Sequence, residues 1–184
     1  MLLADKKATM TEFHIQTLQV REKELDFFVK FYNSISSIGA FLAGFAFSAL
    51  KTSLPKEADP IVTVIFLGLT SASIGFQLCA IMNSCACSVF GPGLFLRGPE
   101  GMRSAEKAID VLQRKSDQTL KFFILGVACT ILSCLIKSFL LYNPFEAIVV
   151  SLILMIMSFF LNDHARASFK ALYVPPETAI TGKI

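Results

Sequence analysis

Charged and catalytic side chains are scarce in this chain. Only 17% of its 184 residues are charged, and it contains two histidines. His14 and His164 are isolated from any metal-ligand spacing, and a lone histidine near a helix end is usually a solvated polar residue. The glycine-proline segments at 91–93 and 98–101 do not match a phosphate-binding loop. We therefore expect no enzymatic activity, no catalytic residue, and neither a cofactor nor a metal site.

The five cysteines also lack a metal-binding pattern. None of them forms a Cys-x-x-Cys pair, and Cys85 and Cys87 are separated by a single residue, an awkward geometry for a metal. Buried free cysteines behave as small apolar residues, which is the interpretation we favour. Palmitoylation of Cys85 or Cys87 is the alternative.

Long apolar stretches dominate the sequence. Hydrophobic residues make up 54% of the chain, and the mean hydropathy is +0.61. Four stretches are long enough to cross about 30 Å of hydrocarbon as helices. They cover about 31–52, 61–90, 119–142 and 144–162. Because residues 1–30 carry charges of both signs, the first stretch does not resemble a cleaved signal peptide. The sequence predicts an all-α protein with four transmembrane helices.

The basic residues lie mostly on one side of these spans. Only Lys51, Lys56 and Lys137 belong to the other side or lean toward it. The remaining fourteen of the 17 are Lys6, Lys7, Arg21, Lys23, Lys30, Arg97, Arg103, Lys107, Arg114, Lys115, Lys121, Arg166, Lys170 and Lys183. Loops rich in Lys and Arg stay in the cytosol. We therefore expect an integral, multi-pass protein with both termini in the cytosol or an equivalent compartment.

The chain divides into three parts on this basis. Residues 1–30 are expected to form a cytosolic helix that extends the first span inward, because Gln16 to Lys30 contains neither Gly nor Pro. The membrane domain covers 31–162. The last part, 163–184, is a cytosolic helical extension and a tail. Its helix should end near Tyr173, because the two prolines that follow cannot continue it.

The connections between spans carry clear signals. The inner connection, 91–118, begins with glycine-proline segments that predict a loop. From Met102 the pattern becomes helical and continues without a breaker into the third span. Pro60 is suited to begin the second helix, and Asn143-Pro144 is a helix start. The third and fourth helices must therefore be antiparallel neighbours.

Small residues line one face of the first span. Ser36, Ala40, Gly44 and Ser48 recur at every fourth position, which aligns them along a helix. In lipid, helices associate through close approach across small residues. This line of small residues is expected to pack either inside a four-helix bundle or against copies of the chain.

A few polar residues interrupt the apolar spans. Lys137 lies inside the third span, where an ionisable group marks function by default. Alternatively, its ammonium group extends to the nearby interface, and Glu146 could lie near it across the short turn. Gln77 and Asn83 lie on opposite faces of the second span.

Three short segments resemble the Orai family of calcium-release-activated calcium channels. They are Ser36 to Leu50, Phe76 to Met82 and Leu135 to Leu141. The order of the helical parts over residues 20–172 is also similar. The resemblance implies a homo-hexamer in which the first spans surround a central pore. Phe41, Phe45 and Ser48 would then face that pore.

The resemblance fails at the residues that hold calcium. The family's ring of glutamates falls on Thr52, beside Lys51, and its inner basic positions include Ser37. Since no acidic residue lies between Asp26 and Glu57, carboxylate-based calcium selectivity is not implied. Glu57 and Asp59 could form a looser ring at the outer mouth. In addition, Lys137 stands where the family has an acid.

Two function classes follow from these observations. The first is an Orai-like oligomeric ion channel with altered selectivity. The second is a non-catalytic, four-span structural subunit of a larger membrane complex. The expected partners are the lipid bilayer and either further copies of the chain or other membrane subunits, and no nucleic acid.

Overall fold

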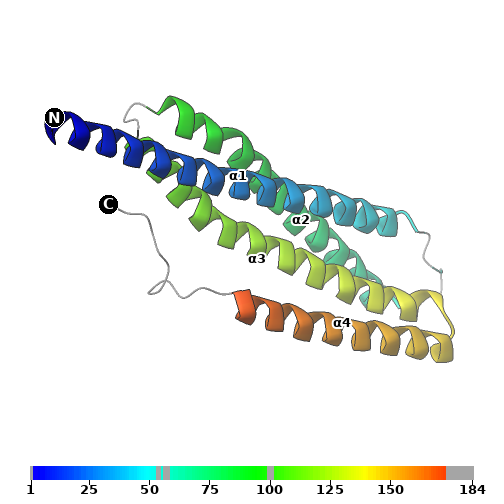
Figure 1. Cartoon of the computed structure of the whole chain (residues 1–184). Helices are drawn as coiled ribbons and strands as arrows, with labels where there is room; N and C mark the ends of the chain where they lie inside the picture. Colours follow the sequence, from blue (N-terminus) through cyan, green and yellow to red (C-terminus); the bar gives the residue numbers. More distant parts are fainter. Residues whose placement is uncertain (1, 53–54, 56–58, 99–101, 173–184) are drawn as a thin grey trace.

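The computed structural model describes residues 2–52, 55, 59–98 and 102–172, and within this part the regular secondary structure is entirely helical. The four helices are α1 (Leu2–Leu50), α2 (Pro60–Arg97), α3 (Met102–Leu141) and α4 (Pro144–Leu172) (Figure 1). Each is long and apolar enough to cross a membrane. The predicted all-α, four-transmembrane-helix fold is therefore confirmed, and the chain is an integral, multi-pass membrane protein.

The helix starts follow the local sequence. Pro60 begins α2, and the Asp59 carboxylate accepts a hydrogen bond of 2.9 Å from the amide of Ile61. Pro144 begins α4, in which the amide of Ala147 donates to the Asn143 carbonyl at 2.9 Å. Both starts were predicted from the sequence and are confirmed. The expected end of α4 near Tyr173 lies outside the described residues.

The loop predicted at 91–93 is wrong. Helix α2 continues through Gly91 and Pro92 as far as Arg97. Proline removes one helical hydrogen bond, so neighbouring contacts must hold the helix at this point. Gly91 is buried, and a Cβ atom there would lie only 3.0 Å from Leu112 Cδ2 of α3. Close packing between α2 and α3 thus compensates for the proline.

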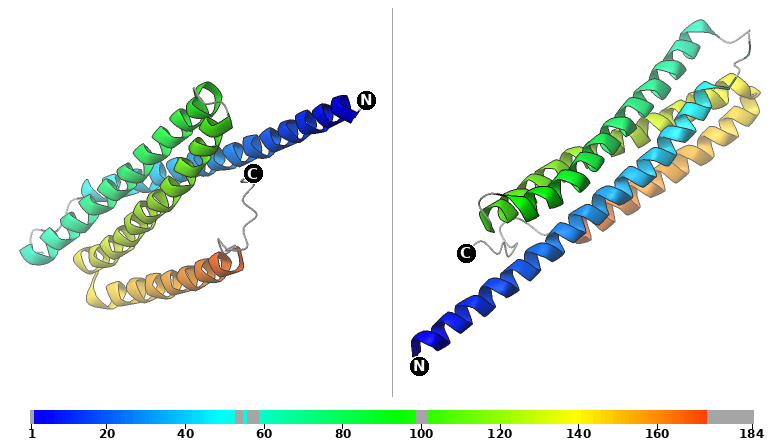
Figure 2. Two further views of the ribbon diagram at one scale, coloured as in Figure 1. Left: turned by 90° about the vertical axis from the view of Figure 1, so that its left-hand side faces the viewer. Right: turned by 90° about the horizontal axis from the view of Figure 1, so that it is seen from above.

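Helices α2 and α3 form the centre of the molecule. Helix α1 packs against both of them, whereas the backbone of α4 approaches only α3. We call the end with the α2–α3 connection the inner end and the opposite end the outer end. Figure 2 shows the N-terminal part of α1 projecting beyond the other helices at the inner end.

One cluster of buried apolar side chains lies toward the inner end. Leu25 and Tyr32 of α1 meet Leu112 of α3, and we call these three residues the inner cluster. Partly buried apolar residues surround it, namely Phe28, Val29, Phe31, Cys87 and Phe95. Helix α4 contributes one buried residue among those described, Ala147.

Candidate functional site: the exposed face of the first helix

Helix α1 has a packed side and an exposed side. Tyr32, Gly39 and Ala46 are buried against the neighbouring helices. Phe41 and Phe45 are 70% and 67% exposed, and they lie on the other side of the same helix. Ser37 and Ser48 are also exposed. Phe41, Phe45, Ser37 and Ser48 therefore share the side of α1 that faces away from α2 and α3, whereas Thr52, just after the end of the helix, is half-buried.

The line of small residues is packed within the chain only at its inner end. Ser36 is half-buried, and its Oγ lies 3.6 Å from Cys85 Sγ of α2. Ala40 and Gly44 are exposed, and a Cβ atom on Gly44 would meet nothing within 4 Å. Packing inside one chain thus accounts for Ser36 alone, and packing of Ala40 and Gly44 against another chain stays a prediction.

Three helices meet around Gln77 of α2. This side chain is fully buried, and a Cβ atom on Gly39 of α1 would lie 3.3 Å from its Oε1. A Cβ atom on Gly126 of α3 would lie only 2.6 Å from its Nε2. Its amide has no hydrogen-bond partner in the described structure. Asn83, which the sequence places on another face, is half-buried.

Hydroxyl groups join α2 and α3 on the outer side of Gln77. Thr70 and Ser133 are hydrogen-bonded at 2.5 Å, and Ser73 and Thr130 at 2.6 Å. The Ser73 hydroxyl also lies 3.0 Å from the Gly126 carbonyl. We call Thr70, Ser73, Thr130 and Ser133 the hydroxyl layer. Sequence analysis missed it, although Thr70, Ser73 and Gln77 recur at the spacing of one helix face.

The outer end of α1 is fixed by a lysine. Lys137 of α3 is half-buried, and its Nζ donates to Thr52 Oγ1 at 2.9 Å. Lys137 and Glu146 both lie in the described part of the chain, and they form no ion pair. Lys51 is exposed and lies over the Phe47 ring, 5.1 Å from its centre. Two lysines, Lys51 and Lys137, therefore lie beside Thr52.

Of the two acids predicted at the outer mouth, Glu57 and Asp59, the structure describes only Asp59. The Asp59 carboxylate is exposed and caps the start of α2 through Ile61. Glu57 lies outside the described residues. Asp59 thus has a structural task that accounts for its position.

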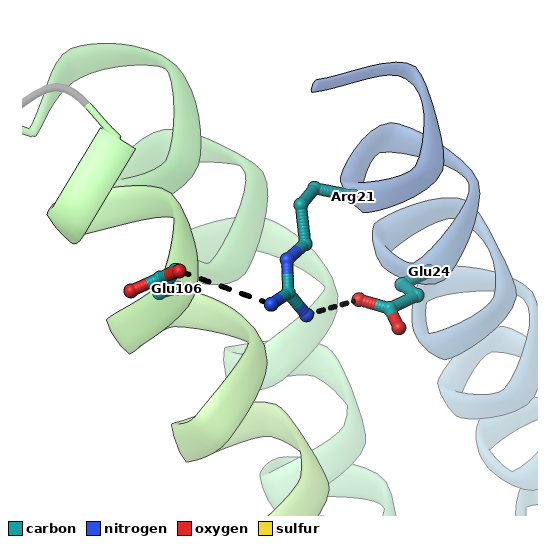
Figure 3. A network of polar contacts seen from close by, with 3 residues as sticks. All are labelled: Arg21, Glu24 and Glu106. Carbon is teal, nitrogen blue, oxygen red and sulfur yellow. Dashed lines mark hydrogen bonds and ion pairs between the residues drawn. The ribbon is translucent and has the colours of Figure 1, made fainter. Parts of the chain in front are cut away.

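At the inner end, two polar contacts attach α1 to α3. Arg21 is largely buried, and its guanidinium lies 2.8 Å from Glu24 and 3.8 Å from Glu106 of α3 (Figure 3). The Tyr32 hydroxyl donates to the Leu112 carbonyl at 2.6 Å. Sequence analysis missed Arg21 and Tyr32. Their positions on one apolar stripe of α1 are the signal that could have found them.

Side chains that could bind a metal are dispersed over the described part of the structure. Among the described residues, no three His, Cys, Asp or Glu side chains are grouped to hold a metal ion. Cys79, Cys85 and Cys134 are exposed on the chain, in contrast to the buried cysteines that we expected. His164 is also exposed.

Comparison with known proteins found no relative of this chain. No family model, no curated protein and no solved structure matches the chain.

Proposed function

We propose that the protein is a non-catalytic, Orai-like ion channel in which α1 helices from several copies line a central pore. The observation that carries this proposal is the exposure of Phe41, Phe45 and Ser48 on the side of α1 opposite its packed side. In a ring of copies, that side would face the axis. Phenylalanine rings there would form a hydrophobic constriction, which gates by excluding water.

The arrangement of the other helices supports a ring with α1 innermost. Helix α4 approaches only α3, so it belongs at the periphery. Ala40 and Gly44 are exposed beside the proposed pore face, where their small side chains permit close contact between neighbouring α1 helices. Positive charge at the inner-end segments favours an orientation with both termini in the cytosol.

The proposed selectivity is not of the calcium type. Calcium channels use rings of carboxylates, whereas here Thr52 is hydrogen-bonded to Lys137 and flanked by Lys51. A ring of lysines repels divalent cations. We therefore infer that the outer mouth favours monovalent ions or anions.

A specific observation favours the alternative of a structural subunit. The Ser34 and Ser37 hydroxyls donate to the carbonyls of Lys30 and Asn33, both at 2.9 Å. Because these exposed hydroxyls are satisfied by their own helix, they need no water-filled pore. The same α1 face would then contact lipid or another membrane subunit.

Cysteine cross-linking in native membranes separates the two proposals. In a background with all five cysteines replaced by serine, Phe45→Cys should form disulfide-linked dimers on oxidation. Ala46→Cys is the matched control, because the adjacent Ala46 is only 3% exposed and faces the packed side. Cross-linking of neither variant, together with a monomeric mass in mild detergent, would contradict the channel.

Ion flux in liposomes tests the pore itself. Phe45→Ser should raise basal flux by hydrating the constriction, whereas Phe160→Ser should match the unmodified protein. Phe160 on α4 is a fitting control because it is 69% exposed, close to the 67% of Phe45. Equal flux from both variants would count against pore lining.

The outer mouth has its own test. Thr52→Glu combined with Lys137→Gln should create a carboxylate ring, and calcium should then block monovalent flux. Lys137→Gln alone is the control, because it removes the charge without adding a carboxylate. Absence of calcium block in the double variant would place Thr52 outside the pore.

A further inference from the structure

A mostly apolar groove lies between the inner parts of α3 and α4. The two helices are joined near the outer end, where Ala147 is buried and the hydroxyls of Ser138 and Ser151 lie 3.0 Å apart. Toward the inner end lies a groove with a volume of about 780 Å³. Pockets for small ligands usually enclose about 300–1,000 Å³, so this volume is sufficient for a bound molecule.

The chemistry of the groove changes along its length. Ile131 and Leu135 of α3 and Met155 and Phe159 of α4 line its apolar part. Its charged lining residue is Arg166, in the inner part of α4. The groove is therefore apolar along the span and cationic at one end.

The charged end lies at the depth of the lipid headgroups. A span of about 20 residues crosses the hydrocarbon, so α4, which begins at Pro144, reaches the inner interface near Asn162. Arg166 is one turn further on, exposed, and has no ion-pair partner among the described residues. On α3, Ile124 lines the groove, and the exposed Lys121 lies about one turn further inward.

We propose that this groove binds an anionic phospholipid. One acyl chain lies along the apolar walls, and the phosphate is bound by Arg166 and Lys121. Arginine binds phosphate through two parallel hydrogen bonds, and basic pockets between membrane helices are known to hold anionic headgroups. Asp163, one turn before Arg166, neither lines the groove nor forms an ion pair with Arg166. The site lies outside the exposed face of α1 and does not depend on ion conduction.

Lipid retention tests the headgroup contact. The full chain is reconstituted with equimolar phosphatidylglycerol and phosphatidylcholine and extracted in mild detergent. Native mass spectrometry then measures the mass of the protein with its bound lipid. The unmodified protein should retain one phosphatidylglycerol per chain in preference to phosphatidylcholine. Arg166→Gln should weaken retention roughly fivefold, which is the usual contribution of one basic residue near an anionic surface. Lys170→Gln, the same type of charge loss on α4 outside the groove lining, should leave retention unchanged.

Filling the groove tests the acyl-chain contact independently. Ala128 lines the groove, so Ala128→Phe should abolish retention of both lipids. Ala167→Phe is the matched control, because Ala167 is exposed on α4 outside the groove lining. Equal retention of the two lipids, equal effects of Arg166→Gln and Lys170→Gln, or no lipid on the unmodified protein would each overturn the proposal. Loss of an oligomer in Ala128→Phe without bound lipid would instead assign the groove to a second copy.

Discussion

The inner cluster joins α1 to α3 and the hydroxyl layer joins α2 to α3, and the two do so by different means. In the inner cluster, the large side chains of Leu25, Tyr32 and Leu112 are buried against one another. In the hydroxyl layer, α2 and α3 approach through Ser and Thr side chains. Burial of apolar surface stabilises helices that are in contact with water, but it gives little advantage within lipid. The position of each cluster along the helices therefore decides which side chains can join them.

The largest expected effect comes from removing volume from the inner cluster. Leu112 is 2% exposed, so Leu112→Ala should lower the free energy of unfolding by about 2–5 kcal/mol. Thermal unfolding in mild detergent measures the change. Leu152→Ala on α4 is the control, because Leu152 is 54% exposed. Equal destabilisation by the two variants would remove the distinction between the inner cluster and the rest of the molecule.

Adding volume should destabilise the middle of the span. Gly126→Val places a side chain against the Gln77 amide and should cost about 1–3 kcal/mol. Gly75→Val is the control, because a Cβ atom there meets nothing within 4 Å. Combining Gly126→Val with Gln77→Ala should restore part of the loss in the same unfolding assay. Failure of that combination to recover stability would show that the two side chains do not compete for space.

A smaller effect is expected from the polar contact within the inner cluster. Tyr32→Phe keeps the ring but removes the hydrogen bond to the Leu112 carbonyl. The expected loss is about 0.5–1.5 kcal/mol, the usual net value of one hydrogen bond. Tyr142→Phe provides the comparison, because Tyr142 is 52% exposed. If both substitutions leave stability unchanged, apolar packing alone accounts for the inner cluster.

The smallest effect should come from the hydroxyl layer. A double-mutant cycle with Thr70→Val and Ser133→Ala isolates their mutual hydrogen bond. Hydrogen bonds between membrane helices average about 0.6 kcal/mol, so we expect a coupling of that size. A coupling well above the loss of stability measured for Tyr32→Phe would reverse the order of the two regions.

The helices could be predicted from the sequence, but several contacts between them could not. Apolar length gives the four spans, and Pro60 and Pro144 give two of the helix starts. Pro92 was misinterpreted as part of a loop because the packing of Gly91 on Leu112 depends on residues far along the chain.

The contacts of the candidate site show the same limit. Glu146 is near Lys137 in sequence, yet Lys137 bonds Thr52, which lies 85 positions away. Residues 39 and 126 must be glycine because a side chain at either position would lie against Gln77, where the three helices meet. By contrast, Phe41 and Phe45 share one exposed side of α1, as their spacing in the sequence predicts. Lining a pore requires contacts with other copies of the chain, so this role stays a prediction.

The uninterrupted length of α1 has a mechanical consequence. Its first glycine is Gly39, and no proline lies before it, so residues 2–38 form a rod of about 55 Å without a natural hinge. A rotation of its projecting end would therefore be carried along the continuous helix, past the packed Gly39, toward Phe41 and Phe45. The ion pair of Arg21 with Glu106 of α3 holds this helix against its neighbour partway along its length.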